Sequence, residues 1–279
     1  MISPFMAASL ASAQQDWPKA FTLWRQAVEG SEQPTAEAWE RLATAALHVG
    51  QRALAFAAIQ QALTLDPTHA GRWFTLGAWY KFANQVEESR AAFLAAVREK
   101  PDYLEALVEA GNTYFGEGRY PEALACYAVA QQHEYCPEAV WNRSLIELVQ
   151  GLMPAAWEGY EARWQSRLFR EPRKRGFMDT LPEWNGKHTH HLLAHGEQGI
   201  GDHVQMLRYV PLIVPRVRQV TLVVRSELVT YTKHLLPDLD VIAWNDPPPA
   251  DASAHHPLFS APFLFQTCLL YTSDAADEL

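Results

Sequence analysis

The residues best suited to chemistry in this chain form one glycine-rich segment, Gly196-Glu197-Gln198-Gly199-Ile200-Gly201-Asp202. Its three glycines let the backbone turn sharply and let a ligand approach it closely, because no Cβ stands in the way. An apolar run at 191–195 precedes the segment, and Val204, Leu207 and Val210 follow at helical spacing, which predicts a strand, a turn and a helix. The unpaired N–H groups at the start of such a helix suit an anionic or sugar-phosphate group.

Three roles are open to Asp202, whose carboxylate stands where a bound phosphate would lie: it caps the helix, repels an anion, or acts as a base towards a hydroxyl group. A glycine turn closed by an aspartate cap accounts for the same residues without a ligand, and the spacing alone favours neither interpretation. His195 and His203 flank the turn and are further candidates for contact with a substrate.

Histidines gather around the expected first strand, but their alternation argues against a metal centre. His188 and His190 alternate to one face, and His191 and His195 alternate to the other, so they do not converge as a ligand set. The three cysteines lack the paired spacing of a zinc site or a disulfide framework. We therefore predict no metal and a reducing compartment, the cytoplasm.

Length and composition favour a globular chain with two domains. The sequence has 279 residues, of which 48% are hydrophobic and 20% are charged. Its formal net charge is −9, without a run of five like charges, which disfavours nucleic acid and anionic membrane surfaces as partners. The first residues lack a basic segment, and no apolar run approaches the length of a membrane span, so we expect neither a secretion signal nor a membrane span.

An internal repeat of 34 residues organises the first part of the chain. Each unit has two short helical patterns with small and large apolar residues at helical spacing, and a proline closes the unit. Units at 36–69, 70–103 and 104–137 are complete, whereas 1–35 fits only in its second helix and 138–165 is degenerate. The coincident pairs are Trp39 and Trp73, Leu42 and Leu76, Gly77 and Gly111, Ala62 and Ala96, and Pro67 and Pro101.

The repeat layout resembles the tetratricopeptide repeat and implies an α-solenoid over 1–165, with ordinary bundle helices as the weaker alternative. The concave face of such a solenoid would bind a protein or peptide. We expect the repeated aromatic residues to be mostly core, and contacts to a partner to come from variable positions on the first helices. The candidates at those positions are Arg72, Lys81, Glu109 and Asn112.

The chain changes character at 166–190, where a basic cluster and a proline and glycine turn predict a connector between domains. The cluster would meet a phosphate, meet the acidic repeat domain, or form a solvated linker. Beyond the connector, β-branched runs at 219–224 and 241–244 alternate with a helical pattern at 226–236. This alternation predicts a parallel sheet, whose ligands would lie at the carboxyl ends of the strands, where the glycine turn falls.

Taken together, the repeats, the segment 157–164, the turn 182–186 and the motifs 196–202 and 205–211 resemble bacterial repeat proteins with a C-terminal glycosyltransferase-like domain. That domain is similar to family 9 heptosyltransferases and, more distantly, to O-linked N-acetylglucosamine transferases. The resemblance implies an α plus α/β chain, with a partial Rossmann-like lobe of a two-lobed transferase at 191–267. It implies Asp202 as the catalytic base. The substrate-binding residues that it implies are Glu197, Gln198, Gly199, Gly201, His203 and Gln205.

The implied reaction is sugar transfer from a nucleotide-sugar, the co-substrate of the full-length protein, to a hydroxyl acceptor, without another cofactor. Residues 268–279 depart from the family and resemble a translated sequencing adapter, so we expect a fragment that lacks the donor lobe and is inactive. The alternative is a protein-binding repeat scaffold whose degenerate transferase-like domain only holds a partner. These two hypotheses differ in whether Asp202 is needed.

Overall fold

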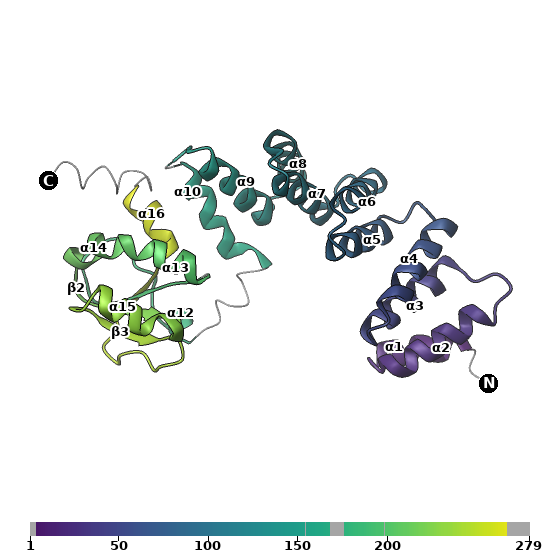
Figure 1. Ribbon diagram of the computed structural model, residues 1–279, viewed down its shortest axis with the longest axis horizontal. Coiled ribbons are helices and arrows are strands. Elements are labelled where there is room, and N and C mark those ends of the chain that lie inside the picture. Colours follow the sequence, from purple (N-terminus) through teal and green to yellow (C-terminus); the bar gives the residue numbers. More distant parts are fainter. Residues whose placement is uncertain (1–3, 154, 168–175, 198, 267–279) are drawn as a thin grey trace. The chain divides into compact units, whose positions relative to one another are not determined.

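The computed structural model describes residues 4–153, 155–167, 176–197 and 199–266 (Figure 1). The chain divides into two compact units, one ending at Ala139 and the other beginning at Val140. Gln198, the adapter-like tail 268–279 and most of the basic cluster of the connector lie outside the described residues. Among the helices described, none is long and apolar enough to cross a membrane.

The N-terminal unit is built from pairs of helices that follow one another along the chain (Figure 1). The three complete units of the repeat pattern correspond to the pairs α3 with α4, α5 with α6, and α7 with α8. The helices are α1 (Pro4–Ala13), α2 (Trp17–Glu29), α3 (Ala36–His48), α4 (Arg52–Leu65), α5 (Ala70–Phe82), α6 (Val86–Glu99), α7 (Leu104–Gly116) and α8 (Tyr120–His133).

Small residues allow these helices to cross closely, as the repeat pattern predicts. Ala62, Ala96 and Ala130 are all fully buried. The segment 1–35 also forms a complete helix pair, although its sequence shows the repeat signature only in the second helix. The reason is local packing: Trp24 of α2 is fully buried, and its indole N–H donates to Ser12 Oγ of α1 at 2.9 Å.

The C-terminal unit contains a parallel sheet with strand order β3-β2-β1-β4. The sequence predicts the first three strands; β4 was missed because its four residues, Ala254–Pro257, carry no β-branched run. The strands are β1 (Thr189–His195), β2 (Val217–Val224), β3 (Asp240–Ala243) and β4 (Ala254–Pro257). The helices are α9 (Pro137–Val149), α10 (Ala155–Tyr160), α12 (Phe177–Thr180), α13 (Ile200–Met206), α14 (Val210–Ile213), α15 (Val229–Leu235) and α16 (Ala261–Phe265).

The two faces of this sheet differ in chemistry, because alternate residues of a strand point to opposite sides. One face is apolar and includes Leu192, Ala194 and Leu222 within the core of the unit. The other face carries buried histidines and a hydroxyl group: His191 Nε2 lies 2.9 Å from Thr221 Oγ1, and His195 and His255 lie 3.2 Å apart through their ring nitrogens.

The segment predicted as a connector is folded where the structure describes it. The helix α12 places Phe177 in ring contact with His195 and Trp244. Glu183 pairs with His255 in an isolated parallel bridge, and the Trp184 amide donates to the His255 carbonyl at 2.8 Å. The turn at 181–186 therefore extends the edge of the sheet at β4 instead of crossing solvent.

The repeat pattern and the packing divide the chain at different places. The pattern continues to about 165, whereas Trp157 and Tyr160 are buried in the same core as the sheet residues Leu192 and Leu222. The last, degenerate helix pair therefore packs with the C-terminal unit, because its large aromatic side chains cover the apolar face of that unit. A functional boundary at 165 stays a prediction.

Candidate functional site

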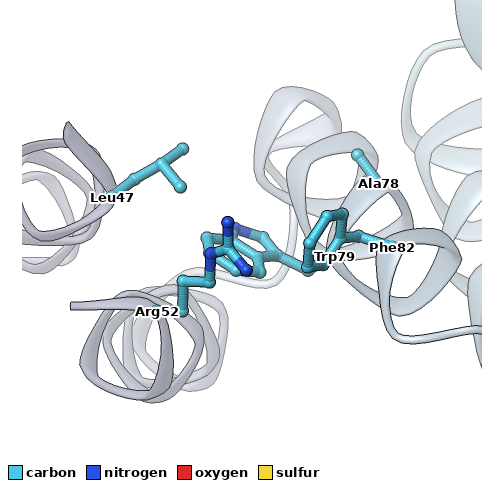
Figure 2. A pocket seen from close by; sticks show the side chains of 5 residues that line it. All are labelled: Leu47, Arg52, Ala78, Trp79 and Phe82. Carbon is cyan, nitrogen blue, oxygen red and sulfur yellow. The ribbon is translucent and has the colours of Figure 1, made fainter. Parts of the chain in front are cut away.

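The clearest hollow in the repeat unit lies between the pair α3–α4 and the helix α5 (Figure 2). It has a volume of about 220 Å³. Leu47 and Arg52 reach into it from one side, and Trp79 and Phe82 of α5 face them from the other. Leu47 is 45% exposed and Phe82 is 67% exposed, although both are large and apolar. Exposed apolar side chains that line a concavity are typical of a site that a partner covers.

The only charged group among the residues lining this hollow is Arg52, whose guanidinium lies over the Phe82 ring at 4.7 Å from the centroid. Stacking of this kind fixes the plane of the guanidinium and leaves its N–H edge free to bind an acceptor. Within the described residues, Arg52 has no carboxylate at ion-pair distance. The hollow therefore combines an apolar wall with an uncompensated cation.

The groove residues predicted from the sequence are held by contacts inside the repeat stack. Arg72 is 6% exposed and bonds to Glu40 at 2.8 Å and to Asp66 at 2.6 Å, so its prediction as a groove contact was wrong. Lys81 and Glu109 form an ion pair at 2.6 Å. These pairs join neighbouring repeat units, which explains why the charges are satisfied within the chain.

Asn112 is also engaged, since its Oδ1 accepts a hydrogen bond from the Tyr127 hydroxyl at 2.8 Å. Burial raises the pKa of Tyr127, so this hydroxyl stays protonated and donates. Lys81 and Asn112 nevertheless line a second hollow, of about 230 Å³, beside Gly116 and Glu117. Their positions agree with the prediction, but their polar groups are already paired.

The glycine turn of the C-terminal unit lies at the carboxyl end of β1, as predicted. Asp202 accepts a hydrogen bond from the Gly199 N–H through Oδ2 at 3.2 Å, so of its three roles the structure displays the helix cap. Gly199, Gly201, Asp202 and Gln205 are exposed and lie together on the surface of this turn. Roles for them in substrate binding stay a prediction.

A glycine is required at 196, where a Cβ would lie 1.6 Å from His203 Nδ1. His203 is fully buried beneath the turn, and neither of its ring nitrogens has a hydrogen-bond partner within the described part of the chain. Burial lowers the pKa of His203 to about 4, so the ring is neutral. The structure therefore places this predicted substrate contact inside the unit, below the exposed residues.

Glu197 also lies inward, with a side chain that is 5% exposed and accepts from Arg163 at 2.7 Å. Arg163 is fully buried and also bonds to Glu161 at 2.7 Å and to Ser260 at 2.9 Å. Burial raises the pKa of Glu197 to about 7, and Arg163 opposes this shift. Arg163 is shared between two carboxylates, which is why its charge does not cancel the effect of burial.

The buried network of Arg163, Glu161, Glu197 and Ser260, here called the arginine network, was missed as a site by sequence reasoning. Its members are far apart in sequence, and the one available signal was an arginine between the aromatic residues Tyr160 and Trp164, over whose rings its guanidinium lies. The network anchors the glycine turn to the preceding helices. Within the described residues, no group of three His, Cys, Asp or Glu side chains is arranged to hold a metal ion.

Comparison with known proteins agrees with this architecture. Protein FlbA of Caulobacter vibrioides is 26% identical over 216 residues, which make up 74% of this chain and 36% of FlbA. The chain thus spans about a third of the length of this curated relative.

Solved structures share the helical repeat fold. A crystal structure of MamA superposes with a TM-score of 0.53 at 15% identity, and the match covers 62% of this chain and 94% of MamA. The C-terminal part of a repeat-containing protein from Cytophaga hutchinsonii has a TM-score of 0.52 at 14% identity, over 64% of this chain and 71% of that one. At such low identity, these likenesses show the fold alone.

The tetratricopeptide repeat family itself matches residues 5–70, 80–135 and 108–169, which together span more than half of the chain. These matches support the repeat part of the resemblance, whereas the glycosyltransferase part depends on the sequence motifs alone. A stack of such repeats is a scaffold suited to protein binding. The chain belongs to the tetratricopeptide repeat family.

Proposed function

We propose that this protein is a binding scaffold whose repeat unit holds an extended peptide segment of another protein in the hollow at Leu47, Arg52, Trp79 and Phe82. One observation carries the proposal: two large apolar side chains, Leu47 and Phe82, stay 45% and 67% exposed at the mouth of a concavity. Covering them removes apolar surface from water, which favours binding by about 25 cal/mol for each Å² buried.

The size of the hollow indicates what part of a partner it receives. A volume of about 220 Å³ is below the range of typical small-molecule sites and suits one large side chain with its neighbours. The hollow lies where two repeat units meet, so a peptide that occupies it would run across the units and gain further contacts along the stack.

A selection with a random dodecapeptide library displayed on phage tests this proposal on the full chain. We expect enrichment of a peptide family on the parent protein and loss of that enrichment on the variant Leu47→Ser/Phe82→Ser. Both substitutions fall on exposed side chains, so the helices are retained. Leu65→Ser, at a side chain that is 54% exposed and outside the hollow, is the matched control. No enrichment on the parent, or equal enrichment on all three proteins, contradicts the proposal.

Sugar transfer is a second proposed function, supported by the exposed Asp202 at the carboxyl end of a parallel strand. Its carboxylate would take the proton of an acceptor hydroxyl. The test is Asp202→Asn in the full-length protein: loss of sugar transfer with unchanged peptide binding supports a catalytic role. Peptide binding without transfer by the parent leaves the scaffold function alone.

A further inference from the structure

The junction between the repeat units 36–69 and 70–103 differs from the next junction by one missing carboxylate. At the next junction, Arg90 of α6 lies over the Tyr114 ring of α7 at 4.8 Å, and it also bonds to Glu117 at 2.6 Å. Glu117 is the residue that ends α7. A guanidinium, an aromatic ring and a carboxylate therefore meet at this junction.

The first junction repeats the guanidinium and the ring without the acid. Arg52 of α4 lies over the Phe82 ring of α5 at 4.7 Å. The residue that ends α5 is Ala83, which stands 34 residues before Glu117 and occupies the same place in its repeat unit. The chain thus places a methyl group where the neighbouring unit places the carboxylate.

We propose that an aspartate or glutamate side chain of the bound peptide supplies this carboxylate and pairs with Arg52, while an adjacent large apolar side chain fills the hollow. The proposal rests on the proposed scaffold function and specifies the chemistry of the partner. Charge complementarity supports it, because Arg52 is the cation that lines an otherwise apolar hollow and no described carboxylate neutralises it.

The geometry also explains why the pairing would be selective. The ring of Phe82 holds the guanidinium in one plane, so its N–H edge is ready for a planar carboxylate and little freedom is lost on binding. A hydrogen-bonded pair between two charged groups at a partly covered site contributes enough to change affinity about tenfold.

The dodecapeptide selection tests this inference when its sequences are compared between the parent, Arg52→Gln and the control Arg98→Gln. Arg98 is 71% exposed and lies outside the hollow. We expect the parent and the control to enrich peptides with an acid next to a large apolar residue, and Arg52→Gln to enrich apolar peptides without the acid. Enriched peptides without an acid preference, or an acid preference that survives Arg52→Gln, overturn the inference and leave the scaffold function intact. Failure of the parent to enrich any peptide overturns both.

A second variant closes the site from within. Ala83→Glu provides at the first junction the acid that Glu117 provides at the next, so it should compete with the peptide for Arg52. With one selected acidic peptide, we expect Ala83→Glu and Arg52→Gln each to weaken binding about tenfold. Changing the acid of the peptide to its amide should have the same effect on the parent and little further effect on Arg52→Gln. Unchanged affinity in both protein variants overturns the inference.

Discussion

The close approach of Gly77 to a buried ring makes the substitution Gly77→Ala a sharp test of how the repeats pack. A Cβ added at Gly77 would lie 2.7 Å from Phe93 Cδ1 and 2.8 Å from Phe93 Cε1, where ordinary contacts are 3.4–4 Å. Phe93 is 1% exposed, so its ring is enclosed by the core and has no room to move aside. The overlap involves the body of the ring and not a flexible tip.

Two opposing effects set the size of the change. Alanine is favoured over glycine within a helix by about 1 kcal/mol. Forcing an extra methyl group into a filled core costs about 1–3 kcal/mol, and an overlap of this depth with a rigid ring belongs in the upper half of that range. We therefore expect Gly77→Ala to lower the free energy of unfolding by about 1–2 kcal/mol.

The matched control is Gly116→Ala, since Gly116 also belongs to a helix but a Cβ there meets nothing within 4 Å. We expect this variant to be more stable than the parent by about 0.5–1 kcal/mol. The assay is urea unfolding of the full chain, followed by the helical circular dichroism signal. A midpoint for Gly77→Ala that equals or exceeds that of the parent refutes the reasoning.

The preceding repeat unit suggests how to restore the loss. There the equivalent residues are Ala43 and Ile59, each 34 residues before Gly77 and Phe93, and both are buried. The double variant Gly77→Ala/Phe93→Ile copies that pair, so its unfolding midpoint should be higher than the sum of the two single changes predicts. Additive effects would show that the glycine and the ring do not depend on each other.

Two further predictions concern the C-terminal unit. Arg163→Met should lower its stability by about 3–5 kcal/mol, because it leaves Glu197 buried without its partner; Arg208→Met, at an exposed site, is the control, and equal midpoints for the two variants contradict a stabilising arginine network. The pKa values of His203 and His256 are lowered to about 4 and about 3 from 6.5, so between about pH 6.5 and pH 4 the unfolded chain binds more protons and stability falls as the pH falls. The raised pKa of Glu197 acts in the opposite direction, as one group against two. Unfolding midpoints measured at pH 7 and pH 5 should drop at the lower pH, and the drop should be smaller in His203→Leu; an equal drop in both proteins counts against the buried neutral histidine.

The repeat fold could be read from the sequence because its information is local and periodic. A helix pair with small residues at its crossing points needs neighbours only one unit away, so the same residue types recur 34 positions apart, as Gly77 and Gly111 do. Even the exchange of Gly77 with Phe93 for Ala43 with Ile59 is visible as a paired change along this period. The parallel sheet was predictable for a related reason, since β-branched strands and helical segments alternate along the chain.

Other features were decided by the tertiary structure. The strand β4 forms from a segment with little strand propensity, because the edge of β1 offers unpaired backbone groups that Ala254–Pro257 completes. The turn at 181–186 is held at that edge for the same reason.

The sequence by itself determined the helix pairs, the strand and helix order, and the place of the glycine turn. Only the tertiary structure decided which side chains are available at that turn and in the groove: Glu197 and His203 are turned inward, Arg72 is paired, and Arg52 is left without an acid. The physical reason is that the availability of a charge depends on partners brought together from distant positions, and this information lies in the packing of the folded chain, not in any local pattern of residues.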